Sequence, residues 1–145
     1  ILHMGKFTRG LGYFYPAKYQ PSAELPDEEY PFTMITGRML YHYNAGAMTQ
    51  RTEGLNELYP SSYMEMRKSD ADSLGIKNGD RVKVTSRRGE IETTAVVGDK
   101  VNYGEVFMTF HFEDGNVNNL TNAATDSFAN VPEYKVCAVH IQRAR

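Results

Sequence analysis

The chain has 145 residues, 41% of them hydrophobic and 23% charged, and its formal net charge is −2. This length suggests one domain of ordinary globular composition, and the small negative charge disfavours a dominant role in binding nucleic acid or another polyanion. No apolar run reaches the length of a membrane span, so we expect no direct membrane insertion.

The first 29 residues are expected to form an extended arm that leads into the folded part of the chain. The stretch "YFYPAKYQPSAELPDEEYP", residues 13–31, holds four prolines and an acidic cluster. Proline removes a backbone donor and biases the residue before it toward extended conformations. We therefore divide the chain into an N-terminal arm, residues 1–29, and one domain, residues 30–145.

Short runs rich in β-branched and alternating residues predict strands along this domain. The expected strands are residues 32–36, 63–66, 81–86, 90–97, 105–110 and 135–141. Between them, "SDADSLG", residues 69–75, predicts a short helix with Ser69 as its N-cap and Gly75 at its C-terminal end. About six strands with little helix predict a mainly β barrel or sandwich.

Two long polar loops, residues 37–62 and 111–134, separate the predicted strands. Each exceeds about fifteen residues, a length that is usually functional or disordered. In the first loop, "TGRMLYHYNAGAMTQR" contains Arg38 and Arg51 and no acidic residue. An arginine fork suits phosphate oxygens, so this composition favours an anion site. A polar surface loop with a tyrosine packed in the core, Tyr41 or Tyr43, fits the composition equally well.

The second loop is rich in amides. Its asparagines are Asn116, Asn118, Asn119, Asn122 and Asn130. An amide offers donors and an acceptor together, which suits the edge of a pterin or a purine. The alternative is that these residues only make turns, as Asn often does.

The histidines, the cysteine and the basic hairpin are weaker signals of function than the two loops. His111, at a strand end, either donates to a ligand or caps the strand, and His42 is similar; no zinc-type spacing links the histidines. The single cysteine, Cys137, excludes a disulfide within the chain and is expected to be a small buried hydrophobe. The basic "RRGE", residues 87–90, is expected to be a solvated hairpin tip.

The chain resembles the C-terminal domain of the molybdopterin oxidoreductase family in three segments taken in order. They are "YPFTMITGRMLYHYNAGAMTQR", "DADSLGIKNGDRVKVTSRRGEIETTAVV" and "GEVFMTFHFEDGNVNNLTNAATDSFANVPEYKVCAVHI". The resemblance runs from about Glu24 to Gln142. Within the family, "ELPDEEYPF" and "PEYKVCAV" are similar to formate dehydrogenase catalytic (alpha) subunits.

This resemblance implies a six-stranded double-psi β-barrel of the aspartate decarboxylase-like kind, with short helices and long loops. It also implies binding of a bis(molybdopterin guanine dinucleotide) cofactor that carries molybdenum or tungsten, in an oxidoreductase such as formate dehydrogenase. Carried over from the family's motifs, the implied cofactor-binding residues are Thr36, Gly37, Arg38, His42, Thr49, Arg51, Phe110, His111, Asn118, Thr121, Tyr134 and Lys135.

The resemblance places the metal-ligating Cys or selenocysteine and the iron–sulfur cluster outside this chain, since Cys137 matches the closing strand. The chain is thus expected to be an excised domain, or a subunit that completes another chain. It should have no catalytic or metal-ligating residue and no turnover of its own. Its expected partners are the remaining domains of the catalytic subunit and electron-transfer subunits, and its expected compartment is the cytoplasm.

Other functions stay open. The same domain occurs in nitrate reductase-like and formylmethanofuran dehydrogenase-like enzymes, and a double-psi barrel can also be a non-catalytic adaptor module. A self-processing decarboxylase is set aside because the sequence contains no Gly-Ser dipeptide. If the chain binds the cofactor, both long loops should leave the same end of the barrel, and Arg38, His42, His111, Asn118 and Lys135 should converge on one concave face. In an adaptor these residues would scatter.

Overall fold

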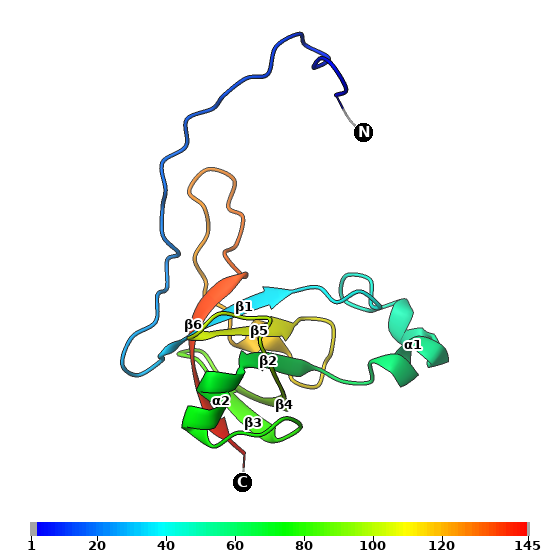
Figure 1. The fold of residues 1–145 in the computed structure, drawn as a ribbon, viewed down its shortest axis with the longest axis vertical. Helices are drawn as coiled ribbons and strands as arrows, with labels where there is room; N and C mark the ends of the chain where they lie inside the picture. Colours follow the sequence, from blue (N-terminus) through cyan, green and yellow to red (C-terminus); the bar gives the residue numbers. More distant parts are fainter. Residues whose placement is uncertain (1–2, 145) are drawn as a thin grey trace.

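In a computed structural model that describes residues 3–144, six strands close into a barrel with the order β1-β5-β2-β4-β3-β6 (Figure 1). The strands are β1 (Phe32–Gly37), β2 (Tyr63–Arg67), β3 (Arg81–Thr85), β4 (Glu90–Gly98), β5 (Glu105–Thr109) and β6 (Val136–Arg143). Each expected strand is present, with small differences at the ends.

The barrel is not a simple meander. β1 runs parallel to β5, and β2 runs parallel to β4, whereas the other neighbouring strands are antiparallel. Parallel neighbours need a crossover, so strands that are distant in sequence become adjacent in space. This interleaved, closed arrangement confirms the predicted six-stranded double-psi β-barrel.

Methionines fill much of the barrel interior. Met34, Met64, Met66 and Met108 are almost fully buried on four inward positions of β1, β2 and β5. Alternation along each strand places every second residue inside, as in β1, where buried and partly buried residues alternate. Burying each such side chain stabilises the fold by about 1.5–3 kcal/mol, and the flexible thioether fills irregular gaps.

The predicted short helix is present as α2 (Lys68–Leu74), but its predicted N-cap is wrong. β2 runs directly into the helix, so Arg67 occupies the N-cap position without a side-chain cap, and Ser69 lies inside the helix. Gly75 ends the helix in the left-handed conformation at φ 66°, which confirms the predicted stop. A second helix, α1 (Glu53–Leu58), lies in the first long loop and was not predicted.

Both long loops leave the same end of the barrel, which we call the loop end. The first follows β1 and precedes β2, and the second follows β5 and precedes β6. Because β1 and β5 are parallel, and β2 and β6 run opposite to them, these four strand termini share one rim. In Figure 1 the first loop projects sideways with α1, and the second rises beside the N-terminal arm.

Residues 3–29 of the N-terminal arm have no regular secondary structure beyond an isolated bridge between Phe7 and Gly10. The arm climbs beside the second loop and then arches over above it (Figure 1). Within residues 3–144, no helix has both the length and the apolar composition that crossing a membrane requires.

Candidate functional site

Three neighbouring strand ends carry two basic side chains around one aromatic ring. Phe110 follows β5, Arg38 follows β1 and Lys135 precedes β6, and β1 lies between the other two strands. The guanidinium carbon of Arg38 lies 5.5 Å from the centroid of the Phe110 ring, and Lys135 Nζ lies 5.7 Å from it. Lys135 Nζ also lies 5.3 Å from the ring of Tyr134. We call this group the Arg38–Phe110–Lys135 cluster.

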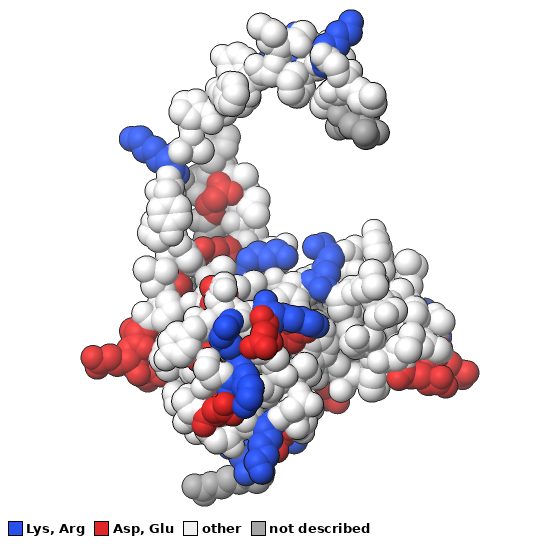
Figure 2. Space-filling view, in the orientation of Figure 1, with Lys and Arg blue, Asp and Glu red and all other residues white. Residues whose placement is uncertain are grey.

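Neither cation of the cluster has a carboxylate partner among the described residues. Both side chains are exposed, and Arg38 Nε donates to the side-chain oxygen of Asn44 at 3.1 Å. In Figure 2, basic side chains border the upper edge of the barrel beneath the curve of the arm. A guanidinium fork beside an ammonium group is a donor set that fits phosphate oxygens, so the residues present fit the phosphates of a dinucleotide.

Thr36 and Gly37, at the end of β1, shape the backbone around this cluster. The Thr36 hydroxyl donates to the Tyr134 carbonyl at 2.9 Å, and the Thr36 N–H donates to the Lys135 carbonyl at 3.0 Å. At Gly37, a Cβ would collide with the ring of Phe107. The buried threonine therefore positions the segment that carries Lys135, and the glycine makes room for a neighbouring ring.

His111 is a clamp on the first long loop. It is 4% exposed; its Nε2 accepts from the Met39 N–H at 3.0 Å, and its Nδ1 donates to the Asn44 carbonyl. These partners require a neutral ring that carries its proton on Nδ1. Burial lowers the pKa of His111, and nearby His42 and Arg38 lower it further, against the opposing hydrogen bond to Asn44.

His42 fastens the same loop to itself. It is 2% exposed, its Nδ1 lies 3.1 Å from the Thr49 hydroxyl, and its Nε2 lies 3.1 Å from the Tyr59 carbonyl oxygen. Thr49 also accepts from the Tyr43 N–H at 3.2 Å. The ring of His42 lies 6.1 Å from that of His111, which lies 4.9 Å from Phe110. A continuous row of rings thus leads from the first loop to the cluster.

The second loop presents Asn118 and Thr121 on a separate part of the loop end. Asn118 lies in the 3₁₀ helix η2 (Val117–Asn119), and the Thr121 hydroxyl donates to its carbonyl at 3.1 Å. The Asn118 side chain is exposed. Asn116 caps this turn by accepting from the Asn118 N–H, so one amide makes a turn while the other faces solvent.

The structure therefore joins four of the five residues expected to converge. Arg38, Lys135 and His111 each lie beside Phe110, and His42 lies beside His111. Asn118 shares the loop end but makes no hydrogen bond or ring contact with them among the described residues. Arg51 is exposed at the end of the 3₁₀ helix η1 (Thr49–Arg51). Among the described residues it makes no hydrogen bond or ring contact with the Arg38–Phe110–Lys135 cluster.

Tyrosine packing in the core, one alternative for the first loop, does not occur. Tyr41 is 38% exposed and Tyr43 is 67% exposed. Tyr41 stacks on Tyr59 with ring centroids 4.9 Å apart, so its ring packs within the first loop.

The hairpin tip at residues 87–90 is exposed at Arg87, Arg88 and Glu90, as predicted, but both arginines also pair with the N-terminal arm. Arg88 forms a bidentate ion pair with Glu24 of the arm, and Arg87 pairs with Asp27. The arginine hydrogen bond lowers the pKa of Glu24, aided by the Ala138 N–H and opposed by burial. Sequence reasoning missed this contact, although the acidic stretch around residue 27 and the basic tip are complementary in charge.

Cys137 is confirmed as a buried hydrophobe, with no exposed surface. Burial raises the pKa of its thiol to about 11, so the thiolate is disfavoured at neutral pH. Within the described part of the chain, no group of three or more His, Cys, Asp or Glu side chains is arranged to hold a metal ion.

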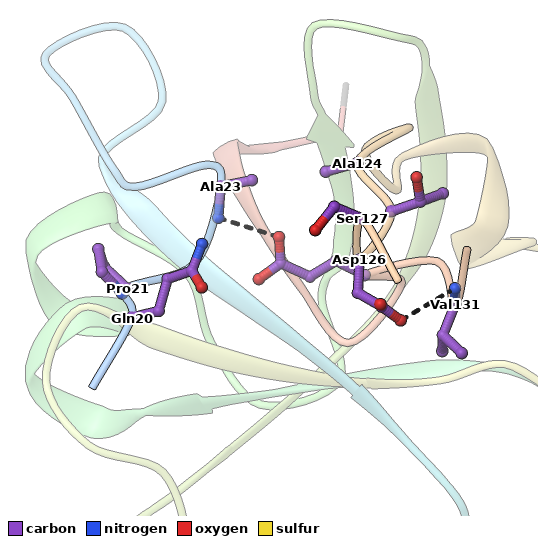
Figure 3. A pocket seen from close by; sticks show the side chains of 9 residues that line it. Gln20, Pro21, Ala23, Ala124, Asp126, Ser127 and Val131 are labelled. Carbon is purple, nitrogen blue, oxygen red and sulfur yellow. Dashed lines mark hydrogen bonds between the residues drawn. The ribbon is translucent and has the colours of Figure 1, made fainter. Parts of the chain in front are cut away.

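A hollow of about 580 Å³ lies between the arm and the second loop, and Figure 3 shows its lining. Ala23 donates its N–H to Glu133 at 2.9 Å across it, and Asp126 accepts from the Val131 N–H. None of the predicted cofactor-binding residues lines this hollow. It is therefore a gap beside the arm, distinct from the Arg38–Phe110–Lys135 cluster.

The chain matches the protein-family model described as "Molydopterin dinucleotide binding domain" over residues 32–138. It is 48% identical over 145 residues to F420-dependent formate dehydrogenase subunit alpha of Methanocaldococcus jannaschii, covering 99% of this chain and 22% of that protein. It is 41% identical over 139 residues to a nitrate reductase of Symbiobacterium thermophilum, covering 93% of this chain and 18% of that protein. The chain thus spans about a fifth of the length of these curated relatives.

Among solved structures, acetylene hydratase from Pelobacter acetylenicus is similar with a TM-score of 0.73 and 13% sequence identity. The superposition covers 92% of this chain and 21% of that one. At this identity the likeness shows a shared fold.

Proposed function

This chain belongs to the molydopterin dinucleotide binding domain family, and we propose that it holds a molybdopterin guanine dinucleotide cofactor at the loop end of its barrel. The observation that carries the proposal is the Arg38–Phe110–Lys135 cluster, in which two cations without carboxylate partners among the described residues share one ring. A phosphate group bound at this cluster would offset the charges of Arg38 and Lys135 and accept hydrogen bonds from them.

The residues of the chain divide the work of binding. Arg38 and Lys135 bind phosphate oxygens, while Asn118 and Thr121 offer an amide and a hydroxyl to the pterin or the linker. His111 and His42 do not need to touch the cofactor, because their ring nitrogens hold the first loop in place. When bound, the metal-carrying cofactor supplies two-electron redox chemistry, and this chain binds and orients it.

We infer that the complete protein acts on formate, with the remaining domains of its catalytic subunit as partners of this domain. Three formate dehydrogenase alpha subunits align over 99% of this chain at 40–48% identity, which supports the inference. A nitrate reductase at 41% identity makes nitrate the second candidate substrate. The protein carrying this chain should therefore oxidise formate with an artificial two-electron acceptor. If it does not oxidise formate but reduces nitrate, the second candidate is favoured.

Cofactor retention tests the proposed binding site directly. The protein carrying the chain should be purified with Arg38→Ala and Lys135→Ala, singly and together, and GMP released by acid hydrolysis should be counted per polypeptide. A hydrogen bond to a charged group contributes about 1.5–3 kcal/mol, so each change should weaken cofactor binding about 10- to 100-fold.

Lys100→Ala is the matched control, because Lys100 is an exposed cation that pairs with Glu65 away from the loop end. It should leave the GMP content unchanged. Full GMP content in the Arg38→Ala, Lys135→Ala double variant would refute the proposed site.

A further inference from the structure

One carboxylate joins the N-terminal arm to two other segments of the chain, the β3–β4 hairpin tip and β6. Glu24 accepts from Arg88 Nη2 at 2.9 Å and from Arg88 Nη1, and its Oε1 also accepts the Ala138 N–H at 2.7 Å. The side chains of Glu24 and Arg88 are only 14% and 28% exposed. This ion pair is therefore shielded and bidentate, unlike a solvated surface pair.

The same guanidinium reaches the second loop. Arg88 Nε and Nη2 donate to the Leu120 carbonyl at 3.0 and 2.7 Å. The Leu120 side chain is fully buried in the barrel core. Leu120 lies between Asn118 and Thr121, so the arginine grips the backbone of the segment that presents both polar side chains.

The hairpin tip also approaches this segment closely. A Cβ at Gly89 would lie 3.1 Å from the Asn119 carbonyl oxygen, which is tighter than ordinary contact. Neighbouring residues 88 and 89 thus fix the 116–121 segment by two independent means, a charged hydrogen bond and a close backbone approach.

We propose that Glu24 and Arg88 form a latch through which the N-terminal arm positions residues 116–121 for contact with the cofactor. The inference rests on the proposed cofactor-binding function and extends it to residues that do not touch the cofactor. Glu24 orients the Arg88 fork, Arg88 holds the Leu120 carbonyl, and Asn118 and Thr121 are thereby presented at the loop end. Both latch residues are positioning residues.

Hydrogen exchange and cofactor content, measured on the protein that carries this chain, test the latch. Glu24→Gln keeps the size of the side chain and removes its charge, whereas Gly89→Ala disturbs the loop contact without altering the ion pair. Glu90→Gln is the matched control, since Glu90 pairs with Lys83 on the same hairpin at 2.6 Å. Exchange should be followed in peptides spanning 112–122, with a peptide from β5 as an internal reference.

We expect both latch variants to raise the exchange rate of residues 116–121 about tenfold relative to β5 and to lower GMP retention, while Glu90→Gln changes neither. Unchanged exchange in Glu24→Gln would overturn the latch, whatever the result for Gly89→Ala. Faster exchange with unchanged GMP content would overturn its role in cofactor positioning. If the Arg38→Ala, Lys135→Ala double variant loses the cofactor but Glu24→Gln retains it, only the latch inference fails; if that double variant retains it, the proposed function fails as well.

Discussion

Replacing His111 with phenylalanine should lower the free energy of unfolding by about 2–3 kcal/mol, because it removes two backbone hydrogen bonds while keeping a ring in place. Nε2 accepts from the Met39 N–H at 3.0 Å, and Nδ1 donates to the Asn44 carbonyl. A hydrogen bond contributes about 0.5–1.5 kcal/mol net, and an orphaned buried donor costs about 1–3 kcal/mol. Asn44 is exposed, so its carbonyl regains water and adds little to the loss.

Urea unfolding of the chain, followed by far-UV circular dichroism, measures this change. His111→Gln offers both a donor and an acceptor and should recover part of the loss. His140→Phe, at an exposed position on β6, is the control and should stay within about 0.5 kcal/mol of the parent. Equal losses from the His111 and His140 phenylalanine variants, or no loss from either, would refute the clamp.

Two further predictions concern pH and a buried hydroxyl. The pKa values of His111 and Glu24 are both lower in the folded chain than their ordinary values of 6.5 and 4.5, so each stabilises the fold above its ordinary pKa and loses that contribution as the pH falls. Urea titrations from pH 8 to pH 4 should show stability declining below about pH 6.5 and further below about pH 4.5; a flat profile would contradict this, and His111→Phe should remove the first decline. Thr109 Oγ1 is buried without a hydrogen-bond partner among the described residues, so Thr109→Val should leave stability unchanged or raise it by up to about 2 kcal/mol. Thr93→Val is its control, since it strands the Ser62 hydroxyl 3.0 Å away and should destabilise by about 1–3 kcal/mol; the opposite order in thermal unfolding would be inconsistent with this reasoning.

The strands were predictable because their signal is local. In β3, the alternation of Val82 and Val84 with Arg81 and Lys83 is visible in the sequence and matches the observed burial. Gly75 likewise predicts a helix end, because glycine adopts the left-handed backbone conformation easily. The helix α1 was missed because "EGLNEL" is short, contains Gly54 and lacks an apolar stripe, so its formation depends on the surrounding loop.

Contacts between residues far apart in the sequence could not be predicted from local sequence patterns. Glu24 and Arg88 are 64 residues apart, and their pairing depends on the arm running beside β6. The motif residues His42 and His111 were identified, but their burial and backbone partners follow from how the first loop folds over the barrel end. The family motifs thus supplied the candidate residues, whereas barrel closure decides what each one contacts.

The strand order explains why the two cations meet. Arg38 and Lys135 come from opposite halves of the chain, and they become neighbours only because β1 lies between β5 and β6. The unfolded chain has no such arrangement, so a dinucleotide bound there binds the closed barrel alone. By linkage, that binding must stabilise the barrel by the free energy of binding at the prevailing cofactor concentration. The affinity for an anion at this place therefore depends on the closure of the barrel.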